Sequence, residues 1–198
     1  MISDLAARGF VLALEGSTQL ATCAIRAPDG QVTELAAPEG ARHVERLPSL
    51  AANVAAEAGA SLANLALVVV GSGPGSYMGI RATVAVANAL SYVAKCPVAE
   101  ISTLDSLGLQ IATTERETTA ALAAGRGRYF VASYQVVDGV VERTSEVALV
   151  DGSEIADLRE RSPSARGHLC AIESRPEWLE RYEVAGAQPR YGPSGREA

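Results

Sequence analysis

The sequence predicts an α/β fold built as two lobes, and three observations support this. Continuous apolar runs of strand length alternate with longer stretches that repeat apolar residues at helical spacing. The order strand, turn, hairpin and helix occurs twice, although no residues repeat. Residues 113–119 form a polar, loop-like stretch between the two series. We therefore expect a larger lobe over residues 1–112 and a smaller one over 113–198, with an irregular Gly- and Pro-rich tail from Ala185.

The first lobe should open with three strands, because two hairpins precede the first helical pattern. A helix should then run between Val44 and Ala58, with Pro48 near its start and Gly59 as its stop signal. Residues 65–70 are the strongest strand signal in the chain and lead directly into a Gly-rich loop. The other expected elements of this lobe are strands at 10–14, 20–26, 31–35 and 97–101, a long helix at 79–95, and a helix at 103–112 capped by Ser102 or Thr103.

The second lobe should repeat this order on a smaller scale. We expect a strand at 120–124, a turn at 125–128, and a hairpin of strands 129–137 and 140–150 across Asp138-Gly139. A short helix over 151–161 should complete it.

Composition limits the classes of function. With 48% hydrophobic and 20% charged residues, the 198-residue chain is typical of a compact soluble protein. Its net charge is −6, and the basic stripe of a protein that holds nucleic acid alone is not visible. The three cysteines show no metal or disulfide spacing, which favours a reducing cytoplasm. We expect neither a signal peptide before Phe10 nor a membrane span.

Residues 71–81 form the first candidate site. A Gly-rich turn between a buried strand and a helix presents backbone N–H groups to a phosphate or carboxylate, which makes Gly73, Gly75 and Ser76 candidate contacts. Pro74 removes a donor and no lysine follows, so the loop is neither a P-loop nor a dinucleotide fingerprint. Alternatively, the glycines only allow close packing, and a side chain at Gly75 or Gly79 would push the helix away from the strand.

Residues 15–18 form the second candidate site. Sugar kinases and actin-like ATPases place an acidic residue and small hydroxyl residues after the first strand to hold metal and phosphate, which makes Glu15, Ser17 and Thr18 candidates. A plain surface turn is the alternative. The two histidines, His43 and His168, are not at metal-ligand spacing, and a nucleophile elbow is missing. We therefore expect neither catalytic nor metal-binding residues.

The helix after the Gly-rich loop is apolar around most of its circumference. Apolar residues from Ala82 to Ala94 cover most of it, and Asn88, Ser91 and Lys95 leave only a narrow polar stripe. Such a helix should be buried on more than one side. It could lie between the two lobes, or it could pack on the sheet with one side and on a partner protein with the other.

Four segments of the chain resemble motifs of the TsaB family, part of the TsaD-like glycoprotease superfamily. Residues 73–81, GPGSYMGIR, resemble GPGSFTGLR, and residues 12–18, LALEGST, resemble LALDTST. Residues 42–48, RHVERLP, resemble HSERLLP, and residues 123–132, AAGRGRYFVA, resemble DARRGEVYAA. Order and spacing agree across about the first 140 residues. The first motif is the most specific of the four.

This resemblance implies an actin-like, ribonuclease-H-like fold and a cytoplasmic accessory protein without catalysis of its own. It implies binding to TsaD, which transfers threonylcarbamoyl to tRNA, and action together with TsaE and the synthase TsaC. Tight cofactor binding is not expected of this chain, and ATP or ADP would bind at the level of the complex. It implies tRNA contact only through that complex and a homodimer when TsaD is absent. The residues implied at the partner interface are His43, Leu47, Ala82, Ala85, Val86, Ala89 and Val93.

The chain also departs from the family pattern. Glu15 stands for Asp, Gly16 for Thr, Asn88 for Lys and Ala123 for Asp. A second histidine near His43 is missing, which favours TsaB over TsaD. Two other functions stay open. An actin-like small-molecule kinase or ATPase would need a second acidic phosphate motif, and a peptidase would need a nucleophile with a base or a metal.

Overall fold

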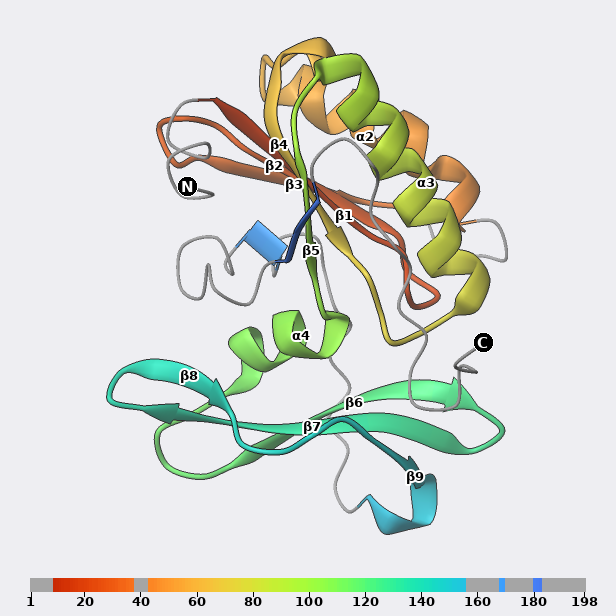
Figure 1. The fold of residues 1–198 in the computed structure, drawn as a ribbon, viewed down its shortest axis with the longest axis vertical. Coiled ribbons are helices and arrows are strands. Elements are labelled where there is room, and N and C mark those ends of the chain that lie inside the picture. Colours follow the sequence, from red (N-terminus) through yellow and green to blue (C-terminus); the bar gives the residue numbers. More distant parts are fainter. Residues whose placement is uncertain (1–8, 38–42, 156–167, 170–179, 183–198) are drawn as a thin grey trace.

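The computed structural model describes residues 9–37, 43–155, 168–169 and 180–182, and their strands form two sheets (Figure 1). The six-stranded sheet has the order β10-β5-β4-β1-β2-β3, and the second sheet has the order β6-β7-β8, with β9 also paired to β7. The first sheet comprises β1 (Phe10–Glu15), β2 (Thr22–Arg26), β3 (Val32–Ala36), β4 (Leu65–Gly71), β5 (Val98–Ile101) and β10 (Glu180–Tyr182).

The central strands of the first sheet are covered on both faces, which explains their continuous apolar runs. Strand β1 pairs antiparallel with β2 and parallel with β4, and β4 pairs parallel with β5. Helices α2 (Leu47–Glu57) and α3 (Tyr77–Ala94) cover one face, where Leu12, Leu14, Val68 and Val70 share a core with Leu47, Ile80 and Val84. On the other face, Val11, Ala13, Leu67 and Val69 pack with Leu169.

The first helical segment begins as a 3-10 turn, η1 (His43–Arg46), and continues as α2 with Pro48 in its first turn. A proline is tolerated there because the first N–H groups of a helix have no intrahelical partner. Gly59 follows the end of the helix with a φ of 66°, and the 3-10 turn η2 (Leu62–Asn64) leads into β4. The predicted start and stop signals are thus confirmed.

The second sheet is held to the first lobe by α4 (Thr103–Ile111), which lies between the two sheets in Figure 1. Its strands are β6 (Thr118–Gly125), β7 (Arg128–Val137), β8 (Val140–Arg143) and β9 (Ala148–Asp151). Leu104 and Leu107 of α4 form a third core with Leu122, Phe130 and Tyr134. The predicted α/β fold in two lobes is therefore confirmed.

Three expectations for elements need correction. The strand expected at 140–150 is two strands, because β8 pairs with residues 134–137 of β7 and β9 with residues 128–131. At the break between them, the Thr144 amide still donates to Ser133, and the Ser133 amide donates to the Ser145 hydroxyl. Ser102 occupies the cap position of α4 without a side-chain capping bond. Of the helix expected at 151–161, only a 3-10 turn, η3 (Gly152–Glu154), lies within the described residues.

Parts of the chain beyond residue 155 lie against the first lobe. Strand β10 pairs antiparallel with β5, and Leu169 belongs to the apolar cluster of the first sheet. This differs from the expectation that everything from residue 113 on forms the second lobe. The tail expected from Ala185 lies outside the described residues. Within those residues, none of the helices combines the length and apolarity needed to cross a bilayer.

Candidate functional site

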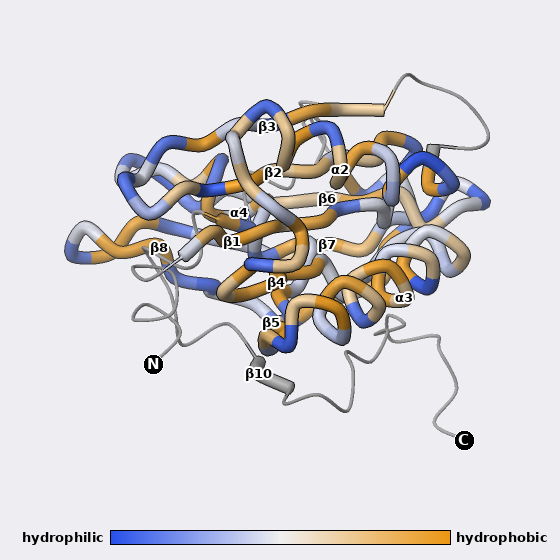
Figure 2. The backbone as a smooth tube through the Cα atoms, turned by 90° about the horizontal axis from the view of Figure 1, so that it is seen from above, coloured by the Kyte–Doolittle hydropathy of each residue, from blue (hydrophilic) through white to orange (hydrophobic). Residues whose placement is uncertain are grey.

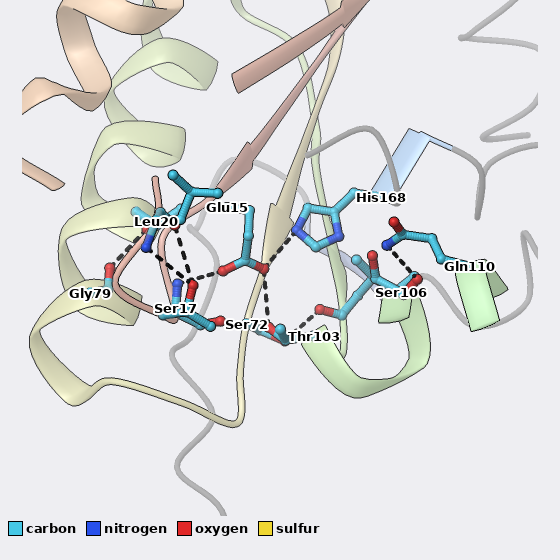
Figure 3. A network of polar contacts seen from close by, with 12 residues as sticks. Glu15, Ser17, Leu20, Ser72, Gly79, Thr103, Ser106, Gln110 and His168 are labelled. Atoms are coloured by element: carbon cyan, nitrogen blue, oxygen red, sulfur yellow. Dashed lines mark hydrogen bonds and ion pairs between the residues drawn. The ribbon is translucent and has the colours of Figure 1, made fainter. Parts of the chain in front are cut away.

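The parallel strands β1, β4 and β5 end at the same edge of the first sheet, and polar residues gather there (Figure 3). In open α/β sheets, ligands bind beyond the carboxyl ends of such strands. Glu15 ends β1, Gly71 ends β4, and Thr103 begins the helix that follows β5. Both candidate sites from the sequence, the turn at 15–18 and the loop at 71–76, therefore meet at one place.

The Glu15 carboxylate is the centre of this cluster and is fully buried. One of its oxygens, Oε1, accepts a hydrogen bond from the Ser17 amide. The other, Oε2, accepts the Thr103 hydroxyl at 3.2 Å and lies 2.9 Å from Nε2 of His168, which is also fully buried. A single carboxylate thus joins the turn after β1, the start of α4 and the segment that carries His168.

Two opposing effects act on the pKa of Glu15. Burial raises it because the charged form loses its hydration. The contact with His168 and the hydrogen bonds from Ser17 lower it, and together they hold the pKa below its ordinary value. Glu15 is therefore a charged carboxylate at neutral pH, stabilised entirely by groups of this chain.

Three glycines allow the backbone segments at this edge to approach closely. A Cβ at Gly71 would overlap the Glu15 carboxylate and the His168 ring. A Cβ at Gly75 would overlap the Ser17 carbonyl, and one at Gly79 would overlap the Gly16 carbonyl. The expected close approach at Gly75 and Gly79 is confirmed, although the neighbour is the turn after β1 rather than the strand before the loop.

The residues that we expected to contact a cofactor have different environments. The Ser76 amide donates to the Ser17 carbonyl at 2.6 Å, and the Ser76 hydroxyl accepts the Gly79 amide as the cap of α3. The Gly73 carbonyl accepts the Thr103 amide at 2.7 Å. Thr18 is half-buried, and its hydroxyl contacts the backbone of Leu20. The structure therefore brings Glu15, Ser17, Gly75 and Ser76 together, whereas the Thr18 hydroxyl contacts only the Leu20 backbone among the hydrogen bonds described for it.

A nucleotide phosphate does not fit on Glu15 as these residues stand. Both carboxylate oxygens already have partners within the chain, and His168 occupies the space beside them with a fully buried ring. A phosphate placed there would also face a buried negative charge without a counter-ion of its own. No group of three metal-ligating side chains occurs among the described residues either.

Sequence reasoning missed Thr103 and His168 as members of the site. The available signal was Glu15 itself, since an acidic residue at the end of an apolar strand needs a partner once it is buried. The sequence did not indicate which donor would reach it, because His168 is far away along the chain. His43 lies at the start of η1, but its side chain is outside the described residues.

Helix α3 presents a second feature, an exposed apolar face. Its inner side, with Ile80, Val84 and Ala87, is buried against β4 and β1. On its outer side the exposed fractions are 67% for Met78, 80% for Tyr92 and 60% for Val93. Figure 2 shows α3 at one edge of the molecule, with the sheet on one side of it. The interpretation that α3 lies between the two lobes is therefore wrong.

The residues expected at a partner interface divide between this outer face and the core. Ala85, Ala89 and Val93 are exposed and Ala82 is half-buried, so these four can reach a partner. Val86 is half-buried and packs against the core. Leu47 is wholly buried, because the start of α2 turns it into the core beneath the sheet, and it must be removed from the expected interface.

Comparison with known proteins identifies the family to which this chain belongs and the fold that it shares. The family model for TsaD, tRNA N6-adenosine threonylcarbamoyltransferase, matches residues 24–173. An uncharacterised protein of Mycobacterium leprae is 33% identical over 134 residues, which cover 66% of this chain and 36% of that protein. The tRNA threonylcarbamoyladenosine biosynthesis protein TsaB of Bacillus subtilis is 27% identical over 115 residues, 57% of this chain and 50% of that protein. The chain thus spans half or less of the length of these two relatives.

The structural comparison confirms the actin-like, ribonuclease-H-like fold. The solved structure of YeaZ from Pseudomonas aeruginosa matches with a TM-score of 0.76 and 20% sequence identity. The match covers 92% of this chain and 99% of that chain.

Proposed function

This chain belongs to the TsaB group of the TsaD family, and on that premise we propose that it is a non-catalytic partner subunit in the formation of threonylcarbamoyladenosine on tRNA. Its partner is a TsaD-type transferase, joined in the larger complex by TsaE. The observation that carries this proposal is the exposed apolar face of α3, which one sheet does not cover.

The chemistry of this outer face suits a helix of another protein. Ala82, Ala85 and Ala89 are small, so a second helix can approach closely along them. Met78 and Tyr92 flank them as large, exposed side chains that can fill pockets of a partner. Next to Met78, the guanidinium of Arg81 lies 5.3 Å from the centre of the Tyr77 ring. The face thus combines an apolar centre with an aromatic and cationic end.

A transferase of the same family is the partner that fits best. Two chains with one fold can meet through equivalent helices about a pseudo-two-fold axis, so that one apolar face serves both. The same geometry allows two copies of this chain to pair when the transferase is absent.

The described site supports an accessory role. The Glu15 carboxylate is enclosed by Ser17, Thr103 and His168, and it is not open to a substrate. The net charge of −6 disfavours tRNA binding by this chain alone. Catalysis and tRNA binding are therefore assigned to the transferase complex, which is also where ATP or ADP would bind.

The test is complex formation with the TsaD-type transferase of the same organism, measured by size-exclusion chromatography with light scattering. Ala85→Glu and Ala89→Glu place a carboxylate at the centre of the exposed face. In the complex this charge would be buried without a partner, which should weaken binding by about 100-fold or more. Ala148→Glu in β9 is the matched control, because Ala148 is also exposed but lies in the second lobe.

All three variants should fold like the parent, since each replaced alanine is exposed in the free chain. The proposal is wrong about α3 if the helix variants bind as tightly as Ala148→Glu. It is wrong about the partner if the unaltered chain does not bind the transferase at all.

A further inference from the structure

The Glu15 cluster is connected to the first turn of α3 through a short series of backbone contacts. Glu15 accepts the Ser17 amide, and the Ser17 carbonyl accepts the Ser76 amide at 2.6 Å. Ser76 caps α3, and the Ile80 amide donates back to the Ser76 carbonyl at 2.9 Å. The turn that Glu15 holds therefore also holds the start of α3.

Close packing leaves this connection little freedom. The backbone at Gly75 and Gly79 touches Ser17 and Gly16 so closely that a Cβ could not be placed between them. The Thr83 hydroxyl donates to the Gly79 carbonyl at 2.8 Å, and a Cβ at Gly16 would overlap that hydroxyl. A shift of the turn at 16–17 must consequently move the first turn of α3 with it.

At the end away from α3, this series of contacts begins with His168, which lies against Glu15. The buried ring of His168 lies against Oε2 of Glu15, and the neighbouring Leu169 is 2% exposed among Val11, Leu67 and Val69. A polar and an apolar contact thus fix this two-residue segment at the edge of the first sheet. Without His168, the buried Glu15 carboxylate would lose the polar group that lies 2.9 Å from Oε2, which is costly unless the turn rearranges or water enters.

We propose that docking of His168 and Leu169 against β1 and β4 controls the position of the first turn of α3, and thereby the end of the exposed face formed by Tyr77, Met78 and Arg81. The segment works as a built-in positioning element at the strand-end site. This inference rests on the proposed function, since α3 is the proposed partner-binding helix. It means that the contacts of His168 and Leu169, which lie on the other side of Glu15 from α3, determine the position of one end of the binding surface.

Amide hydrogen exchange on the full, free chain tests this directly, because the acceptors of the relevant amides are known. The amides of Ser17, Ser76, Gly79 and Ile80 are bonded within the series. In His168→Ala we expect their exchange to accelerate about tenfold, which corresponds to about 1.4 kcal/mol of local opening. Exchange in the middle of β7 should stay unchanged. In His168→Gln, a side-chain amide can still donate to Glu15, and most of the protection should return.

Tyr134→Phe is the matched control for a lost buried contact elsewhere. It removes the hydroxyl that donates to Asp105 at 2.7 Å, so exchange should rise around α4 and β7 and not at Ser76 or Ile80. Leu169→Ala removes only the apolar half of the docking contact. It should accelerate exchange at the same four amides, which keeps the inference testable if His168→Ala does not fold.

The inference is overturned if His168→Ala and Leu169→Ala leave these four amides protected, or if they accelerate exchange evenly over both lobes. A titration with the transferase separates this result from the proposed function. His168→Ala should weaken binding by about tenfold although its site is buried. Failure of the unaltered chain to bind contradicts the proposed function, whereas unchanged exchange contradicts only the present inference.

Discussion

The length of the Glu15 side chain determines which partners its carboxylate can reach. The family motif that the chain resembles has Asp at this position, and Glu places the carboxylate one methylene farther from the backbone. From there it reaches the Thr103 hydroxyl and the His168 ring while still accepting the amide of Ser17. The substitution thus coincides with a carboxylate that is satisfied by residues of its own chain.

Glu15→Gln should lower the free energy of unfolding at pH 7 by about 3 kcal/mol, because it removes a buried carboxylate that accepts hydrogen bonds from the Ser17 amide and the Thr103 hydroxyl. The folded pKa of Glu15 lies below its ordinary value of 4.5. Its stabilisation is therefore fully present above about pH 4.5 and is lost as the pH falls through the lowered pKa. In urea titrations from pH 7 to pH 3, the difference between parent and variant should narrow below pH 4.5.

The exposed Glu142→Gln is the control for a lost surface charge, and it should stay within about 0.5 kcal/mol of the parent. Equal unfolding midpoints for the two variants at pH 7 would show that Glu15 contributes no more than a surface carboxylate.

Gly75 and Gly79 matter because of the space they leave for the turn after β1. Gly75→Val should lower the free energy of unfolding by about 1–3 kcal/mol, since its side chain would collide with the backbone of Ser17. Ala148→Val at an exposed position of β9 is the control for an added β-branched side chain. Thermal melts of both variants measure the difference, and an unchanged melting temperature for Gly75→Val would mean that the loop yields without cost.

At the scale of elements, α4 contacts the second sheet through a polar cluster as well as through the apolar core that contains Leu104 and Leu107. Asp105 accepts the Tyr134 hydroxyl at 2.7 Å, and Arg143 of β8 lies 3.2 Å from the same carboxylate. Burial raises the pKa of Tyr134, and the nearby Asp105 charge raises it further, so the phenol stays a neutral donor. Gly108 packs beside this cluster, and a Cβ at that position would overlap the Tyr134 ring.

Tyr134→Phe should lower the free energy of unfolding by about 1.5–3 kcal/mol, the usual contribution of a hydrogen bond to a charged group. Arg143 remains to pair with Asp105, which favours the lower end of that range. Tyr129→Phe, at a half-buried position of the same strand, is the control. Chemical denaturation of both variants decides the question, and equal losses would mean that the contact with Asp105 adds nothing.

Most elements of the first lobe could be predicted because each has a local signal. The apolar runs gave β1 and β4, and Pro48 and Gly59 marked the two ends of one helix. The break between β8 and β9 could not be predicted, because both strands are short and their pairing with two halves of β7 is a tertiary property. The sequence did not decide whether the outer face of α3 would be buried or exposed, since alanine is compatible with core, interface and surface.

At the scale of the whole molecule, one part of the site could be predicted from local sequence motifs and the other part could not. Glu15, Ser17, Gly75 and Ser76 follow from motifs at strand ends, and the topology brings them together. His168 and Thr103 could not be assigned, because neither belongs to a motif and both act through the tertiary fold. The apolar cluster around Leu169 likewise depends on the return of the chain to the first sheet.

The proposed division of labour predicts the outcome of a reconstitution. The purified chain alone should neither modify tRNA nor hydrolyse ATP at about 1 per second, the lower range of ordinary enzymes. Added to its transferase, with TsaC, TsaE, ATP and the small-molecule substrates of the synthase, it should raise the threonylcarbamoyladenosine content of tRNA, measured by mass spectrometry of the digested nucleosides. Ala148→Glu should support the reaction fully.

Ala89→Glu should support it only at high concentration, because a buried charge weakens the interface rather than the chemistry. Product formation by the chain alone would show that it is an enzyme, contrary to its enclosed Glu15 carboxylate. Full support by Ala89→Glu at low concentration would place the functional contact away from α3. Poor support even at saturating concentration would mean that α3 does more than bind, and that its position also affects the transferase active site.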